Sequence, residues 1–134
     1  MKPEDLKERT KQFALRVLKL VAALPRTLAG KTVGSQLVRS GTSVGANYRA
    51  ACRARSKLEF IAKIGIVEEE ADESDYWLEL AVEAGLLKAD RVAQLRDDAQ
   101  HIVAMTVLSI RRAREARPAA PHAARRTLSL TGHC

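Results

Sequence analysis

The sequence predicts an all-α fold, an antiparallel up-down-up-down four-helix bundle over residues 1–115, followed by a disordered basic C-terminal tail at 116–134. Between Val33 and Gly85, mostly apolar or small residues recur at alternating spacings of four and three, as in helices that keep one face against a neighbour. Aromatic residues make up only 4% of the chain, so Leu, Ile, Val and Ala must form the core. Connectors of about 4–7 residues join the predicted helices, which favours antiparallel neighbours.

The first helix is predicted over residues 4–24. Glu4 and Asp5 suit the positive end of the helix dipole, and Pro25 ends the helix because it cannot continue the hydrogen-bond ladder. The stripe that should face the core is Leu6, Thr10, Phe13, Val17, Leu20 and Leu24.

The second helix is predicted over residues 31–54 despite three internal glycines, Gly34, Gly41 and Gly45. Each glycine costs a helix interior about 0.8–1 kcal/mol relative to alanine. We therefore expect either close approach of another helix along this segment or a bend in it.

The third and fourth helices have clear end signals. Ser56 and Glu59 form a capping box at the start of the third helix, and Gly85 suits the left-handed position that ends it. Asp90 is a candidate N-cap for the fourth helix, which should end near Arg114. No acid follows Glu115, and a run of alanines with two prolines predicts disorder there.

Charge is segregated along the chain, whose net charge is +7. Residues 1–55 hold twelve Lys and Arg against three acids, residues 56–110 hold five against twelve, and residues 111–134 hold six against one. Such a split concerns association rather than fold. It would let acidic and basic segments attract one another, within or between subunits, and leave basic surface for an anionic polymer.

Two polar residues of the second helix, Ser40 and Asn47, occupy positions that should point inward. A buried polar residue commonly bonds to a neighbouring helix and fixes register. That role is the main interpretation, and a ligand-binding role is the alternative.

Arginines are the candidate nucleic-acid ligands, because their forked guanidinium groups match phosphate oxygens and bind the backbone without reading sequence. An alternative for Arg49 and Arg53 is pairing with acids of the third helix. The C-terminal arginines have one acid nearby, which makes them better candidates for a phosphate-binding arm. The full set is Arg49, Arg53, Arg55, Arg111, Arg112, Arg114 and Arg117.

The remaining chemistry-bearing residues predict no enzyme, metal or cofactor. The acids at 68–75 wrap around their helix and lack the Glu-x-x-His pattern of di-metal bundles, so a solvated or inter-subunit face is expected. His101 is alone in the body of the chain, with no catalytic partner pattern. Tyr76 and Trp77 are adjacent, so we expect one inside the bundle and the other at a subunit interface.

Residues 36–49 (QLVRSGTSVGANYR) and 76–79 (YWLE) resemble a bacterial four-helix-bundle family related to proteins encoded in intervening sequences of large-subunit ribosomal RNA genes. The resemblance covers about residues 5–110 and implies a homo-oligomer, typically a pentameric ring. It also implies a distant relation to accessory proteins of diversity-generating retroelements, which bind a reverse transcriptase and RNA. Close members often carry an acid where this chain has Ala50.

These observations leave two hypotheses for function. The first is a cytoplasmic homo-oligomer, without a membrane span, that binds RNA or DNA backbone through its basic surface and tail. The second is a protein–protein scaffold or accessory subunit, for example of a reverse transcriptase, with no intrinsic nucleic-acid binding. A marked fall of affinity with salt would distinguish the first from the second.

Overall fold

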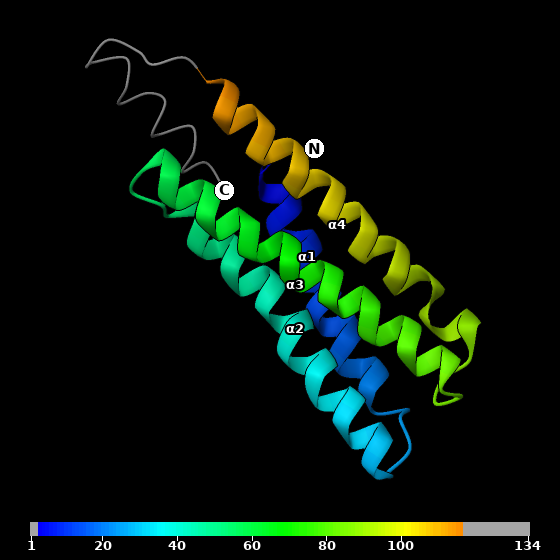
Figure 1. Ribbon diagram of the computed structural model, residues 1–134. Helices are drawn as coiled ribbons and strands as arrows, with labels where there is room; N and C mark the ends of the chain where they lie inside the picture. The colour runs from blue at the N-terminus through cyan, green and yellow to red at the C-terminus, as the bar shows by residue number, and fades with distance from the viewer. Residues whose placement is uncertain (1–2, 117–134) are drawn as a thin grey trace.

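The computed structural model describes residues 3–116 and forms four α-helices there: α1 (Pro3–Val21), α2 (Leu28–Cys52), α3 (Lys57–Glu83) and α4 (Ala89–Glu115) (Figure 1). Successive helices run antiparallel, with extensive packing of α1 on α2, α2 on α3 and α3 on α4. α1 and α4 make much less contact with each other. The predicted up-down-up-down bundle is confirmed. The predicted tail lies outside the described residues, apart from Ala116.

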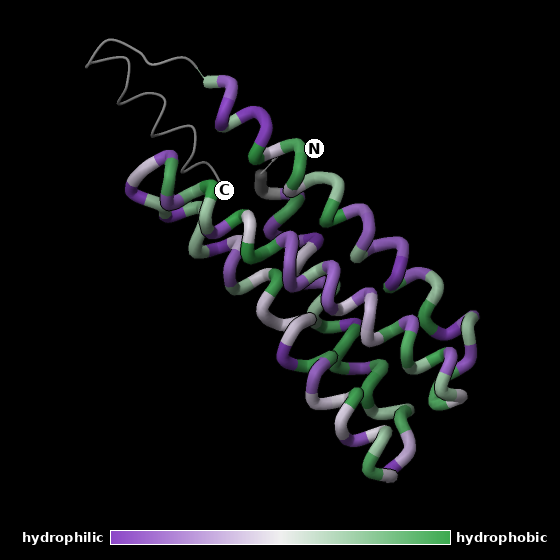
Figure 2. Tube along the Cα trace, in the orientation of Figure 1, coloured by the Kyte–Doolittle hydropathy of each residue, from purple (hydrophilic) through white to green (hydrophobic). Residues whose placement is uncertain are grey.

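Amphipathic helices supply a single core. Each helix alternates hydrophobic and hydrophilic residues along its length (Figure 2). The predicted stripe of α1 is buried from Leu6 to Leu20, while Leu24 is half-buried. The largest fully buried side chains come from all four helices: Phe13, Leu37, Ile64, Leu78 and Ile102.

The close approach predicted by the glycines of α2 is found between α1 and α2. A Cβ atom on Gly41 would lie 2.9 Å from both methyl carbons of Val17, which is closer than real contacts allow. A Cβ on Gly45 would lie 3.4 Å from the carbonyl oxygen of Thr10. The two backbones therefore meet where α2 lacks side chains, and tertiary packing compensates for the poor helix propensity of glycine.

Several helix ends differ from the sequence prediction by a few residues. α1 ends at Val21, and the amides of Ala23 and Leu24 bond to carbonyls three residues back instead. α2 begins at Leu28 because the Thr27 hydroxyl accepts from the Gly30 amide at 3.1 Å. The N-cap of α4 is Lys88, without a side-chain cap, so Asp90 lies in the first turn.

The end signals of α3 are confirmed. Ser56 Oγ accepts from the Glu59 amide at 3.1 Å, and the Glu59 carboxylate accepts from the Arg55 amide, one residue before the cap. At the other end, Gly85 has φ +73°. The amide of Leu86 bonds to the Ala81 carbonyl at 2.8 Å, which completes a Schellman motif.

Within residues 3–116, none of the helices carries an apolar stretch long enough to cross a membrane.

Candidate nucleic-acid interface

The antiparallel order of the helices brings two groups of arginines to one end of the bundle. α2 ends at Cys52 and α4 ends at Glu115, and both ends lie beside the start of α3 (Figure 1). The Lys57 ammonium group donates to the Ala116 carbonyl at 3.0 Å and so joins the start of α3 to the end of α4. We call the following residues the basic end: Arg49, Arg53, Arg55, Arg111, Arg112 and Arg114.

All six side chains of the basic end are exposed. Among the residues that the structure describes, none of them has an ion pair within 4.0 Å. Their guanidinium donors are therefore free for an anion. The remaining predicted member, Arg117, lies outside the described residues.

The arginines that do pair with acids lie in the middle of the bundle. Arg16 of α1 binds Asp98 of α4 at 2.7 Å. Arg39 of α2 binds Glu70 at 3.0 Å and also Glu73, both on α3. Within the described residues, neither Arg49 nor Arg53 forms an ion pair with an acid of α3, and Arg39 is the arginine of α2 that does.

Arg96 of α4 joins two acids of α3. Its Nε lies 2.7 Å from Asp75 and an Nη lies 2.9 Å from Glu79. The hydrogen bond to Asp75 raises the pKa of Arg96 above its ordinary value. The acidic run of α3 is thus split between α2 and α4, and residues 3–116 hold no group of three His, Cys, Asp or Glu suited to a metal ion.

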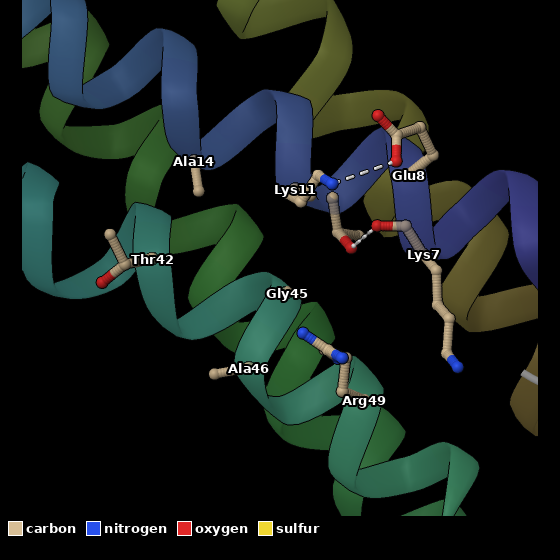
Figure 3. A pocket seen from close by; sticks show the side chains of 9 residues that line it. Lys7, Glu8, Lys11, Ala14, Thr42, Gly45, Ala46 and Arg49 are labelled. Atoms are coloured by element: carbon tan, nitrogen blue, oxygen red, sulfur yellow. Dashed lines mark hydrogen bonds and ion pairs between the residues drawn. The ribbon is translucent and has the colours of Figure 1, made fainter.

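A groove between α1 and α2 adjoins the basic end (Figure 3). It has a volume of about 400 Å³, and its lining includes small residues, among them Ala14 and Ala46. Arg49 reaches back along α2 toward Gly45, and Lys11 lies on the α1 side.

A second groove, between α3 and α4, is of mixed charge. Its apolar lining includes Ile61, Val103 and Ile110. The charged residues of the lining are Glu68, Glu69, Asp72 and Arg114. Its volume is about 510 Å³. Three acids against one arginine make this groove less suited to an anion than the groove between α1 and α2.

The two inward polar residues of α2 behave differently. Ser40 is fully buried, as predicted, and its Oγ lies 2.9 Å from the hydroxyl of Ser74 on α3. Asn47 is half-buried, and its amide donates to Ser43, at 2.9 Å to the carbonyl and 2.8 Å to the hydroxyl. The hydrogen bond predicted from Asn47 to a neighbouring helix is therefore replaced by bonds within α2.

Tyr76 and Trp77 differ in burial, although their rings are in contact. Trp77 is half-buried against the core and donates from its indole nitrogen to Glu73 at 3.0 Å. Tyr76 is 54% exposed, and its ring meets that of Trp77 edge-on at 5.1 Å. Tyr76 is thus the member of the pair available to a partner.

Sequence reasoning missed Lys7, Lys11 and Ser74. Lys7 and Lys11 line the same groove as Arg49, although 38 or more positions separate them in the chain. Ser74 stands at one of the four-and-three positions between Val33 and Gly85 and so was expected in the core, but only the fold shows that it meets Ser40.

Comparisons with known proteins agree on one family. A family model described as 23S rRNA-intervening sequence protein matches residues 4–107. A crystal structure from Bacteroides thetaiotaomicron VPI-5482, described as a protein with unknown function from the S23 ribosomal protein family, is 31% identical. It matches with a TM-score of 0.70 over 78% of this chain and 97% of its own. A search of curated proteins finds no match.

Proposed function

Because the chain belongs to the 23S rRNA-intervening sequence protein family, we propose that it is a non-enzymatic homo-oligomer that binds nucleic-acid backbone through its basic end. The observation that carries this proposal is the gathering of six exposed arginines where α2 and α4 end, none of which forms an ion pair within residues 3–116. In the described part of the chain, Arg16, Arg39 and Arg96 already have acidic partners. The fold thus separates arginines that stabilise it from arginines that are free to bind.

Arginine chemistry favours phosphate as the ligand of the basic end. A guanidinium group donates two parallel hydrogen bonds to a phosphate, so several of them follow a backbone without contacting bases. Arg111, Arg112 and Arg114 also lie at the negative end of the α4 dipole, which favours cations there. Aromatic residues form only 4% of the chain, which disfavours recognition by base stacking.

Exposed apolar side chains support the homo-oligomer. Leu15 and Leu18 of α1 are 50% and 44% exposed, and Tyr76 of α3 is 54% exposed. Aromatic residues are enriched in protein interfaces. A pentameric ring remains part of the proposal on the strength of the family resemblance.

The same apolar side chains favour a second candidate function. In this version the chain is a protein–protein scaffold or an accessory subunit, for example of a reverse transcriptase, and the basic end binds an acidic protein surface. It predicts an oligomer that binds no nucleic acid at any salt concentration.

The test is binding of the purified full chain to fluorescein-labelled RNA and DNA oligonucleotides, followed by fluorescence anisotropy at about 50 and 200 mM salt. Solution mass is measured alongside by light scattering. We expect affinity to fall with a logarithmic slope of about 0.7–0.9 per neutralised phosphate. The variant Arg53→Gln/Arg112→Gln should bind several-fold more weakly and with a smaller slope.

The matched control is Arg26→Gln/Arg91→Gln, which removes two exposed arginines from the opposite end of the bundle. It should bind like the parent chain. Equal losses in both variants would show that net charge, rather than the basic end, determines binding. An intact oligomer that binds neither RNA nor DNA would leave the scaffold function.

A further inference from the structure

We infer that the groove between α1 and α2 is a phosphate-binding site, in which Arg49 from one helix and Lys7 and Lys11 from the other hold the oxyanion. The inference rests on the proposed function. It adds a groove with two lysines to the basic end, whose arginines lie on exposed helix ends. Three cations and one acid, Glu8, line this groove.

The cations come from two helices and flank a floor of small side chains. Figure 3 shows the guanidinium group of Arg49 directed toward Gly45, with Lys11 on the facing side of α1. Arg49 has no ion pair within 4.0 Å among the described residues. With a glycine and alanines in the lining, an anion can lie close to both helices without a large side chain in its way.

The acid of the groove is already neutralised in part. The Glu8 carboxylate accepts from the Gln12 amide at 2.9 Å and lies 3.5 Å from the Lys11 ammonium group. These two contacts, the amide first, lower the pKa of Glu8 below its ordinary value. Arg49 and Lys7 therefore supply positive charge that no acid of the groove balances.

The hydroxyl groups that line the groove already donate hydrogen bonds to backbone carbonyls. The groups left to donate are positively charged, which favours an anion as the ligand. Thr10 donates its hydroxyl to the Lys7 carbonyl at 3.1 Å, and Thr42 donates to the Val38 carbonyl at 2.6 Å. The donors left are ammonium and guanidinium groups. These groups suit phosphate oxygens, whether in a phosphodiester backbone or in a free phosphate compound.

The volume and position of the groove favour the phosphodiester source. About 400 Å³ is room for a nucleotide unit, and the groove includes Arg49, which lies one helical turn before Arg53 at the end of α2. A strand that contacts the basic end can therefore continue between α1 and α2.

The experiment places a carboxylate in the groove. Ala46 is exposed on α2, so Ala46→Glu adds a negative charge there without disturbing the core. Ala93→Glu, at an exposed position near the start of α4, is the matched control with the same change of charge and helix propensity. Both variants are titrated with labelled RNA, and the parent chain is titrated with inorganic pyrophosphate while amide NMR signals are recorded.

We expect Ala46→Glu to weaken the affinity for RNA at least about tenfold more than Ala93→Glu does. The reason is that a carboxylate in the groove repels the phosphates that would bind there. Pyrophosphate should shift the amide signals of Gly45 and Ala46 selectively. RNA binding that responds equally to both variants would overturn the groove site and leave the proposed function standing.

The other outcomes separate the two proposals. Selective pyrophosphate shifts in a chain that binds no RNA or DNA would support the phosphate site, with a free phosphate compound as its ligand, and end the proposed function. The site would be overturned by two results together: pyrophosphate shifts no amide signals or shifts them evenly over the surface, and Ala46→Glu and Ala93→Glu bind RNA equally well.

Discussion

A pair of buried serine hydroxyls joins α2 and α3. Ser74 lies within 2.9 Å of both the Ser40 hydroxyl and the Glu70 carbonyl, so neither buried oxygen lacks a partner. An unsatisfied buried hydroxyl would cost about 1–3 kcal/mol. A shift of α2 along α3 would separate the two hydroxyls and leave them without partners. The pair therefore favours one register of the two helices, which is the role predicted for Ser40.

At the residue scale, Gly41 and Gly65 should respond in opposite ways to alanine. In Gly41→Ala the new Cβ meets two methyl carbons of Val17 at 2.9 Å, and overpacking of this kind costs about 1–3 kcal/mol. Gly65→Ala meets no atom within 4 Å and should gain about 0.5–1 kcal/mol from helix propensity. Urea unfolding followed by circular dichroism measures both. A stabilised Gly41→Ala variant would mean that α1 and α2 can move apart.

The helix ends differ in how well their amides are satisfied. Thr27 and Ser56 each accept a backbone amide at 3.1 Å and hold the starts of α2 and α3. α4 begins after Lys88, whose side chain makes no cap hydrogen bond although its backbone is extended as an N-cap requires. The start of α4 is therefore the weakest of these three.

At the element scale, Lys88→Ser should stabilise the bundle. A serine at this extended position can accept from an amide of the first turn, which is worth about 1 kcal/mol at a helix N-terminus. Ser56→Ala should lose a similar amount and serves as the reverse control. The midpoint of urea unfolding measures both changes. No gain in Lys88→Ser would show that water already satisfies these amides.

The four helices do not contact one another equally. Each packs mainly on the helices that precede and follow it in sequence, and the contact between α1 and α4 that would close the bundle is small. α2 and α3 each pack extensively on two neighbours, whereas α1 and α4 each pack extensively on one. The ion pair of Arg16 with Asp98 joins the two outer helices, α1 and α4. Exposed ion pairs contribute about 0–1 kcal/mol, so this one adds little to closure.

At the scale of the molecule, amides of α2 and α3 should exchange with deuterium more slowly than those of α1 and α4. Protection follows the local free energy of opening, which is lowest where few buried contacts must break. Hydrogen exchange with mass spectrometry on the full chain measures it, and Arg16→Gln should speed exchange in α1 slightly. Equal protection of all four helices would indicate that other subunits cover α1 and α4.

Local patterns account for what could be predicted correctly. The four-and-three spacing predicted the second and third helices and placed Ser40 inside, and the capping box and Gly85 located the ends of α3 to within a residue. Lys88 was missed as the cap of α4 because lysine carries no cap acceptor and Asp90 does. Asn47 was misjudged because a short side chain can bond to its own helix instead of a neighbour.

Contacts between helices were beyond the sequence. Arg39 and Arg49 are ten residues apart, hence about 80° apart around α2 at 100° per residue. Because of that difference, Arg39 contacts acids of α3, whereas Arg49 lines the groove between α1 and α2. Which of the two pairs depends on how α2 is rotated against its neighbours, and side-chain packing across the whole bundle sets that rotation.

The sequence by itself determined the helices, the blocks that identify the family, and a supply of arginines, because each depends on residues within a few turns of one another. The tertiary structure decided which arginines are free. It brought the ends of α2 and α4 together at the basic end and set Lys7 and Lys11 opposite Arg49. Charged residues from distant parts of the sequence form a binding site only when the helices that carry them pack side by side, and local sequence does not determine that packing.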